Sequence, residues 1–300
     1  MSDAELAGAG IEIAGGALER PDLVALGRER LGALERAQIA FVRRTFEPGL
    51  VDRGVRLMQR TVGAGWIHHC TKHLRHVVGT ERLPRFDRKQ SYILVSNHRS
   101  FFDLYVVTAE LVRRGLHHRI VFPVRSAFFY TSPLGLFVNG VMSFFAMYPP
   151  IFRNRRKAPL NPASLAELGW LLRRGGAFAG LHPEGTRNLG DDPYSFLPAQ
   201  RGVGRIIHYA RVPVIPVFIN GLINHLPRQV MSNFDGTGRQ VLVVFGAPID
   251  FGDLLAAKRS PKVDQAIADR TLDVIAELGR EERALREAIE PRGADSDNMA

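Results

Sequence analysis

Two short segments carry residue types that could move a proton or bind a phosphate, and each contains a histidine. The first runs from Asn97 to Asp103 and reads NHRSFFD. A loop that bends back could place the Asp103 carboxylate on one nitrogen of His98, leaving the other nitrogen to accept a proton from a substrate hydroxyl. Such general-base assistance raises a rate by roughly 100- to 10,000-fold. The same spacing has a simpler interpretation, because Ser100 and Asp103 ahead of an apolar run can form a helix capping box.

The second segment runs from His182 to Asn188 and reads HPEGTRN. Pro183 fixes the exit from the preceding apolar run, and Gly185 lets the backbone approach a ligand closely. Arg187 offers a planar guanidinium that suits phosphate, and Glu184 could orient that arginine or bind a substrate hydroxyl. The alternative interpretation of this segment is an exposed turn with two surface charges.

The elements that must position these segments alternate between strand and helix patterns from about residue 81 onward. The predicted strands are Tyr92–Val95, Arg119–Val124, Ala177–Leu181, Val212–Ile219 and Gln240–Phe245. The predicted helices are Asp103–Arg114, Pro162–Arg174, Gly202–Ala210 and Lys262–Ile289. This alternation predicts a layered α/β fold with a largely parallel central sheet flanked by helices. Both histidine segments directly follow a predicted strand, which is where such folds place their chemistry.

An N-terminal helical pair is predicted ahead of this sheet, at Leu18–Phe46 and Val51–Val78. The second pattern has apolar positions at spacings of three and four, at Val51, Val55, Met58 and Val62. Its other side is basic, with Arg53, Arg56 and Arg60. Such a helix can lie in a lipid interface, or it can pack on the main domain with a solvated basic face. The predicted organisation is a disordered start at 1–16, the helical pair at 17–78, the main domain at 79–290 and a disordered tail at 291–300.

The longest uncharged stretch runs from Ser126 to Phe152. It is long enough to cross a bilayer, which takes about 20 residues in a helix. Prolines and glycines interrupt it, and each would break a helix or expose polar backbone to lipid. A buried or membrane-dipping segment is therefore favoured over a spanning helix.

Composition narrows the class of partner. The chain has 300 residues, 45% of them hydrophobic, which is enough to bury a sizeable core. The net charge of +10 indicates an anionic partner, which could be nucleic acid, an acidic lipid surface or a phosphorylated substrate. Cys70 is the single cysteine, so no intrachain disulfide can form, as in proteins of a reducing compartment. Residues Met1–Gly16 do not have the pattern of a secretory signal.

Taken together, the two segments resemble the motifs of the glycerophospholipid acyltransferase family, whose type member is 1-acylglycerol-3-phosphate acyltransferase. That family carries Asn-His-x-x-x-x-Asp, followed much later by Phe-Pro-Glu-Gly-Thr-Arg-Ser. Two further family blocks have counterparts at Ile151–Arg153 and Val212–Val217. The resemblance covers about residues 77–249. The conjunction of four blocks in the expected order is far more specific than either histidine segment alone.

The resemblance implies an O-acyltransferase of phospholipid biosynthesis, in which His98 is the base and Asp103 orients it. The implied substrate-binding residues are Asn97, Arg153, Glu184, Gly185, Thr186 and Arg187. The implied donor is an acyl-CoA or acyl-carrier-protein thioester, and the acceptor is a lysophosphatidate or glycerophosphate-type lipid. No cofactor, metal or nucleic acid is implied. We expect a peripheral or monotopic protein on the cytoplasmic face of a membrane, with an anionic membrane surface as partner.

Four residues depart from the family pattern, at Met147, Phe152, His182 and Asn188, and they make the exact acceptor uncertain. Another lysophospholipid or a lyso-aminolipid is therefore an alternative acceptor. A second class of alternative is a non-catalytic basic module that binds membranes or nucleic acid, although no nucleic-acid motif supports it. The histidines between His68 and His76 have no carboxylate near them in sequence, so a solvated or membrane-facing side is favoured there over a metal site.

Overall fold

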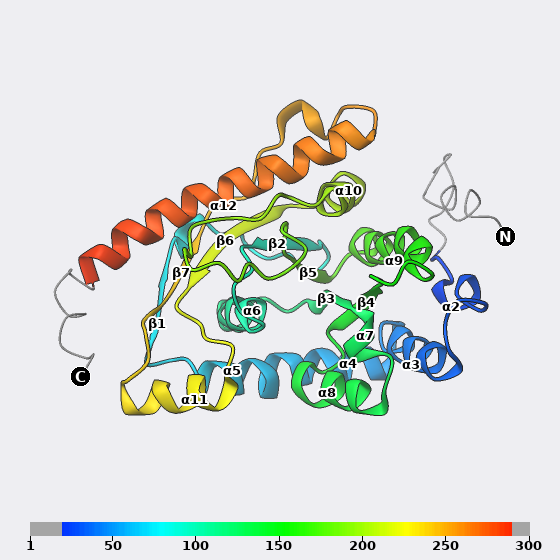
Figure 1. Cartoon of the computed structure of the whole chain (residues 1–300), viewed down its shortest axis with the longest axis horizontal. Helices are drawn as coiled ribbons and strands as arrows, with labels where there is room; N and C mark the ends of the chain where they lie inside the picture. Colours follow the sequence, from blue (N-terminus) through cyan, green and yellow to red (C-terminus); the bar gives the residue numbers. More distant parts are fainter. Residues whose placement is uncertain (1–19, 290–300) are drawn as a thin grey trace.

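The computed structural model describes residues 20–289, and its centre is a seven-stranded sheet (Figure 1). The strands in chain order are β1 (Arg75–Val78), β2 (Tyr92–Ser96), β3 (Arg119–Arg125), β4 (Met147–Ile151), β5 (Ala177–Leu181), β6 (Val214–Asn220) and β7 (Val241–Phe245). Their spatial order is β1-β7-β6-β2-β5-β3-β4. All pairings are parallel except β6 with β7, so β1 and β7 run opposite to the other strands. The predicted layered, largely parallel α/β fold is confirmed.

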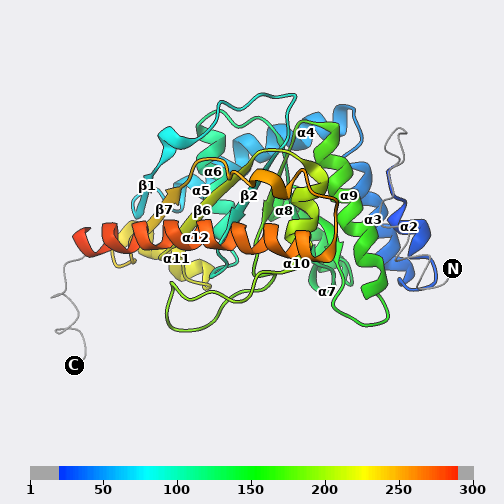
Figure 2. The ribbon, with the colours of Figure 1, turned by 90° about the horizontal axis from the view of Figure 1, so that it is seen from above.

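Helices cover both faces of the sheet. On one face lie α9 (Asn161–Arg174), α10 (Arg201–Ala210) and α12 (Pro261–Ile289), which occupy the upper part of Figure 1. Below the sheet lies α6 (Asp103–Arg113), and beneath it a row of helices forms the lower border of the molecule. That row contains α3 (Ala33–Arg44), α4 (Leu50–Met58), α5 (Ala64–His69), α8 (Pro133–Ser143) and α11 (Leu226–Asp235). Figure 2 shows α12 running along the length of the sheet.

The central strands β2 and β5 bring the two histidine segments together. Every residue of both strands is buried, as expected for parallel strands covered on both faces. Tyr92 pairs with Phe178 and Val95 with Leu181, so the two strands end side by side at the same edge of the sheet. His98 and His182 follow directly after these ends. The register of two neighbouring strands therefore places the two segments next to one another.

The N-terminal helical pair differs from its prediction. The first helix is divided into α2 (Leu23–Leu26) and α3, with a turn between them. The second continues from α4 through a π-helical turn (Gln59–Gly63) into α5, and it ends at His69. The prediction that this helix extends to Val78 is wrong, because residues 75–78 form β1. The β-branched Val77 and Val78 pair with strand β7, and this sheet pairing outweighs the apolar spacing that continued the helical pattern.

Helix α4 and the turn after it have a polar side that faces the protein interior. Asp52 is 6% exposed and lies 2.8 Å from Arg56 Nε and 3.5 Å from Arg119 Nε. The Gln59 amide, 4% exposed, donates to the carbonyl oxygen of Ile120 and accepts from its N–H. The apolar residues point outward instead, and the exposed ones are Leu50, Val51, Leu57, Met58, Val62 and Trp66. This arrangement is the reverse of a helix that packs on a core and faces water.

Other helices of the same row also expose large apolar side chains. They are Leu34 and Phe41 of α3, Leu134, Phe137 and Val141 of α8, and Met231 and Phe234 of α11. We refer to these residues, together with the exposed ones of α4, the turn and α5, as the apolar face. These elements lie along one side of the molecule (Figure 1). An apolar surface that is spread over so many neighbouring helices indicates an interaction site.

The uncharged stretch Ser126–Phe152 forms the short helix α7 (Ser126–Phe129), then α8 and the edge strand β4. Pro133 lies in the first turn of α8, where a missing N–H costs no hydrogen bond. Within residues 20–289, no helix combines the length and the apolar character needed to cross a membrane.

Candidate active site

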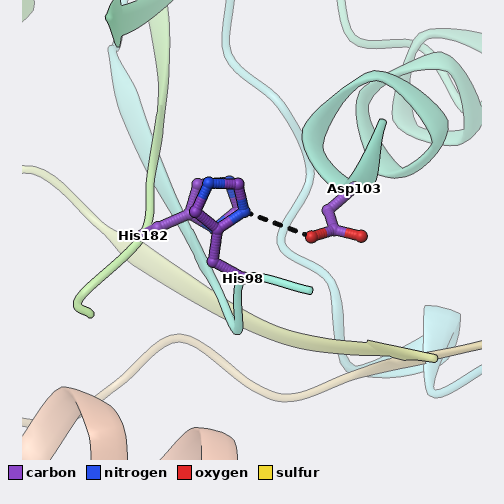
Figure 3. A group of neighbouring side chains, drawn as sticks. All are labelled: His98, Asp103 and His182. Carbon is purple, nitrogen blue, oxygen red and sulfur yellow. Dashed lines mark hydrogen bonds and ion pairs between the residues drawn. The ribbon is translucent and has the colours of Figure 1, made fainter. Parts of the chain in front are cut away.

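The loop after β2 bends back and brings Asp103 to His98. Asp103 Oδ2 lies 3.3 Å from His98 Nδ1, and the dashed line in Figure 3 marks this contact. The carboxylate is almost completely buried, with 1% of its side chain exposed, whereas 19% of the His98 side chain is exposed. A carboxylate can only accept, so His98 carries its proton on Nδ1 and presents a free lone pair at Nε2. This is the arrangement that a general base needs.

The Asp103 carboxylate also holds the loop itself. Its Oδ2 accepts the backbone N–H groups of Arg99 and Ser100, both at 2.8 Å. The bond from Ser100 is half of a capping box, but the Ser100 hydroxyl accepts from Phe102 N rather than from Asp103 N. The two interpretations drawn from the sequence therefore coexist, because one carboxylate both shapes the loop and contacts the imidazole.

The second histidine segment fixes the backbone of His98 on both sides. His98 N donates to Glu184 Oε1 at 2.9 Å, and His98 O accepts from Asn188 N at 2.8 Å. The other oxygen of Glu184 accepts from Leu197 N at 2.9 Å. Both oxygens of this buried carboxylate thus bind backbone groups, and the structure places Glu184 as a support of His98 rather than in contact with Arg187.

Asn97 also points away from the open part of the site. Its side-chain amide donates to Ile219 O and accepts from Ile219 N, at 2.8 and 2.9 Å, and only 1% of the residue is exposed. These two bonds tie the end of β2 to β6. Sequence reasoning placed Asn97 among the substrate-binding residues, and the structure gives it a different position, below the site and against the neighbouring strand.

The ring of His182 stacks on the ring of His98. Their centroids are 3.7 Å apart and their planes differ by 7°. Figure 3 shows the two rings lying one over the other. His182 Nδ1 lies 3.1 Å from Ser96 O, and this bond fixes the ring on the end of β2. The stacked ring restricts His98 to the plane in which it meets Asp103. His182 can therefore take the place of the aromatic side chain that usually precedes this motif.

Two arginines lie on the open side of His98. Arg153 Nη2 donates to Gly185 O at 2.9 Å, and Arg187 Nη1 donates to Asn224 Oδ1 at 3.0 Å. Both side chains are exposed, and their positive charges are close enough to disfavour protonation of His98. Gly185 adopts a φ of 66°, and a Cβ there would lie 2.8 Å from Gln200, so only glycine fits this turn. Thr186 is exposed in the same turn and makes no side-chain hydrogen bond within the described residues.

Two comparisons with known proteins give a match. Residues 75–220, which run from β1 to the end of β6, match the family model named Acyltransferase. Residues 75–220 therefore form an acyltransferase domain. The chain is also similar to the crystal structure of the 1-acyl-sn-glycerophosphate (LPA) acyltransferase PlsC from Thermotoga maritima, with 18% identity, 87% of each chain covered and a TM-score of 0.48. A search of curated protein sequences finds no match.

In this acyltransferase, burial sets the protonation of the His98–Asp103 pair. Burial, together with the charge of Arg187, lowers the pKa of His98 to about 4, and burial raises the pKa of Asp103 to about 6. At neutral pH the imidazole is therefore neutral and the carboxylate ionised. Burial and the adjacent His98 lower the pKa of His182 to about 3, so the stacked ring is neutral as well. Both members of the pair are in the state that a general base requires.

The position of these three side chains also raises the question of a metal ion, because their ligand atoms lie within 4.8 Å of one another. A metal lies close to the plane of each imidazole that binds it, at about 2.0–2.1 Å from the nitrogen. The parallel, stacked rings of His98 and His182 have planes too far apart to share such a position. The group is thus poorly suited to a metal ion and well suited to proton transfer.

Asn224 is a site residue that sequence reasoning missed. Its Oδ1 accepts from both Arg187 Nη1 and Phe101 N, and its Nδ2 donates to Arg99 O. It follows β6, the other neighbour of β2, and so reaches the same edge of the sheet. The only sequence signal for Asn224 was its position, because it is a polar residue shortly after a third parallel strand. No recognisable motif surrounds it.

We expect the His98 titration in this acyltransferase to lie well below the ordinary imidazole value of about 6.5. NMR titration of the full chain, with His98→Gln to assign the resonance, measures it directly. Replacing Arg187 with glutamine removes a positive charge that opposes protonation, so the His98 pKa should rise. A His98 pKa at or above 6.5 in the unaltered protein would contradict the burial argument.

Proposed function

We propose that this acyltransferase moves a fatty acyl group from an acyl thioester to the hydroxyl of a lysophosphatidate or glycerophosphate-type acceptor. The observation that carries the proposal is the His98–Asp103 pair at the carboxyl end of β2, with two exposed arginines beside its open side. A base next to two cations suits an acceptor that has both a hydroxyl and a phosphate.

The proposed reaction is a direct transfer. His98 Nε2 takes the hydroxyl proton as the acceptor oxygen attacks the thioester carbonyl carbon. The new C–O bond forms, the C–S bond breaks, and the departing thiolate receives the proton from His98. Because the thioester already has a good leaving group, the step needs no cofactor, metal or covalent enzyme intermediate. Asp103 stabilises the transient imidazolium through Nδ1.

The acceptor side is proposed to involve Arg153 and Arg187 with the exposed turn at Gly185 and Thr186. Asn97 and Glu184 would act indirectly, through β6 and through the backbone of His98. Met147 and Phe152, which depart from the family pattern, are buried in the core, so they shape the acceptor side only through packing.

We further propose that the apolar face docks on a membrane, peripherally or monotopically and on the cytoplasmic side. Its support is the reversed orientation of α4, with Asp52 and Gln59 inside and Leu57, Met58 and Trp66 outside. A lipid acceptor resides in the membrane, and an apolar surface beside the catalytic domain would bring the site to it. Arg53 is exposed on the same helix and would add attraction to anionic lipid.

Product analysis on a panel of acceptors tests the transfer. The purified chain would be given an acyl-CoA and, separately, glycerol 3-phosphate, lysophosphatidate, a lysophospholipid and a lyso-aminolipid. We expect the phosphorylated glycerol acceptors to be consumed fastest. Preference for a lyso-aminolipid would point to the alternative acceptor class, and lipid binding without any thioester consumption would support the non-catalytic module.

Vesicle flotation tests the membrane proposal. Trp66→Ser and Leu57→Ser should each lower partitioning by about tenfold to a hundredfold, since burying a large apolar side chain is worth about 1.5–3 kcal/mol. Ile289→Ser is the matched control, because Ile289 is exposed but lies at the end of α12. Arg53→Gln should weaken binding to anionic vesicles only. Arg56, which we expected to act in the same way, is instead held by Asp52 and Gly176 O. Equal partitioning of all variants would contradict the proposed face.

A further inference from the structure

A cavity of about 320 Å³ lies where α9, α10 and α12 begin. This volume is within the range of about 300–1,000 Å³ that small-molecule sites occupy. Three arginines line it, Arg201, Arg205 and Arg259, together with one acid, Asp264. The helices that line the cavity lie on the side of the sheet opposite the row that carries the apolar face (Figure 1). None of its residues takes part in the proton transfer described above.

The charged side chains that line this cavity leave hydrogen-bonding groups without partners among themselves. Within residues 20–289, Arg201 and Arg205 make no hydrogen bond or ion pair, and Arg259 Nη1 is 3.9 Å from Asp264 Oδ2. Arg205 Nε and Asp264 Oδ1 are buried without a hydrogen-bond partner, and only 5% of the Asp264 side chain is exposed. Burial and the nearby Arg259 lower the pKa of Arg205. Unpartnered buried charges are costly, and a ligand that pairs with them would relieve that cost.

The backbone adds to the attraction for anions. Three helices of ten or more residues begin at the cavity, and neither α9 nor α10 has a side chain capping its first turn. The start of α9 offers no free N–H at Asn161 or Pro162, because Asn161 N donates to Ala158 O and proline has none. The uncapped first turn of α10 and the positive ends of the helix dipoles favour a phosphate there. With three arginines against one carboxylate, the cavity is suited to a ligand with more than one negative charge.

The cavity borders the candidate active site through two contacts. Asn161, which lines it, bonds through its amide to both backbone groups of Phe152, the residue before Arg153. Arg201 follows Gln200, whose N–H donates to Pro183 O in the second histidine segment. A ligand held in this cavity would therefore lie next to the turn that carries Gly185 and Arg187.

We propose that this cavity binds the nucleotide end of a coenzyme A thioester, with the arginines on its phosphates and Asp264 on a ribose hydroxyl or the adenine amino group. This inference rests on the proposed function, since it names the carrier of the acyl donor. Asp264 supports a nucleotide over a carrier protein. A buried carboxylate pairs with hydroxyl or amino donors, and the acidic surface of a carrier protein would be repelled by the Asp264 carboxylate. A carrier protein is also too large to enter a cavity of this size.

Calorimetric titration with adenosine 3′,5′-bisphosphate tests the site without any chemistry. We expect saturable binding to the full chain, weakened about tenfold or more by Arg205→Gln or Arg259→Gln, because each removes a charge-assisted hydrogen bond. Arg270→Gln, an exposed arginine further along α12, should bind like the unaltered protein. Asp264→Asn should lower the preference for the nucleotide over inorganic pyrophosphate. Absence of binding, or equal loss in the Arg270 variant, would overturn the proposal.

Kinetics separate this proposal from the proposed function. Arg205→Gln should raise KM for acyl-CoA about tenfold, while leaving the rate with a short acyl-pantetheine thioester, which lacks the nucleotide, unchanged. If Arg205→Gln and Arg259→Gln both leave the rate of transfer from acyl-CoA unchanged, the proposed function remains and the proposed nucleotide site is refuted. Nucleotide binding that the variants abolish, in a protein that acylates no lysolipid, would support the site and refute the function. The site is also refuted if the protein prefers an acyl-carrier-protein thioester to acyl-CoA and the two arginine variants keep that preference.

Discussion

Replacing His98 with alanine should lower kcat by roughly 100- to 10,000-fold, the range expected when a general base is removed. The fold should survive the change. The bonds that hold this residue, to Glu184 Oε1 and from Asn188 N, use its backbone, and alanine keeps both. Steady-state kinetics with a soluble short-chain acceptor, together with thermal unfolding, measures the two effects separately. A variant that retains the unaltered rate would refute the role of His98.

Asp103→Asn is the companion variant, because the Asp103 carboxylate has two roles. An asparagine oxygen can still accept from Arg99 N and Ser100 N, but it no longer provides a charge to stabilise the imidazolium. We expect a strong loss of kcat together with a stability loss of about 1 kcal/mol. If only stability falls and kcat stays normal, the carboxylate serves the loop and not the proton transfer.

Arg153→Gln and Arg187→Gln should each raise KM for a phosphorylated acceptor by about tenfold to a hundredfold, and the double variant by more. A hydrogen bond to a charged group is worth about 1.5–3 kcal/mol, and each 1.4 kcal/mol is a factor of ten. KM for the acyl donor should stay the same. Arg155→Gln provides a matched control, since Arg155 is exposed two residues beyond Arg153.

An acceptor without a phosphate sharpens this test. The unaltered protein should use it poorly, and the arginine variants should use it no worse than the unaltered protein does. A uniform loss on both acceptors in well-folded variants would show that the arginines act on the loop and not on phosphate. The Arg187 variant needs this control more than the Arg153 variant does. Arg187 bonds to Asn224, and Asn224 accepts from Phe101 N in the loop that carries His98.

The central part of the fold could be predicted from sequence because its strands are short apolar runs with clear ends. Strand β4 was missed, since Pro149 and Pro150 argue against a strand. Its position explains the exception, because β4 is the last strand of the sheet and an edge strand tolerates residues that cannot donate. Strand β1 was missed because its pairing with β7 joins residues more than 160 positions apart, which no local pattern reveals.

In the site, too, local features could be predicted from sequence and long-range contacts could not. The spacing of His98 and Asp103 is local, and the structure brings the two together as predicted. Asn97 bonds to Ile219 and Glu184 bonds to the backbone of His98, and both partners are distant in sequence. Their side chains therefore support the backbone instead of facing the open site. Asn224 could not be found, because its importance comes from the strand order alone.

The proposed docking of the apolar face, which rests on the reversed orientation of α4, would make lipid a participant in the folding equilibrium. A membrane that binds the apolar face stabilises the native state and not the unfolded chain, so stability should rise with lipid concentration as RT ln(1 + L/Kd), where L is the lipid concentration. Under that proposal, the melting temperature of this acyltransferase would depend on the membrane surface as well as on the protein.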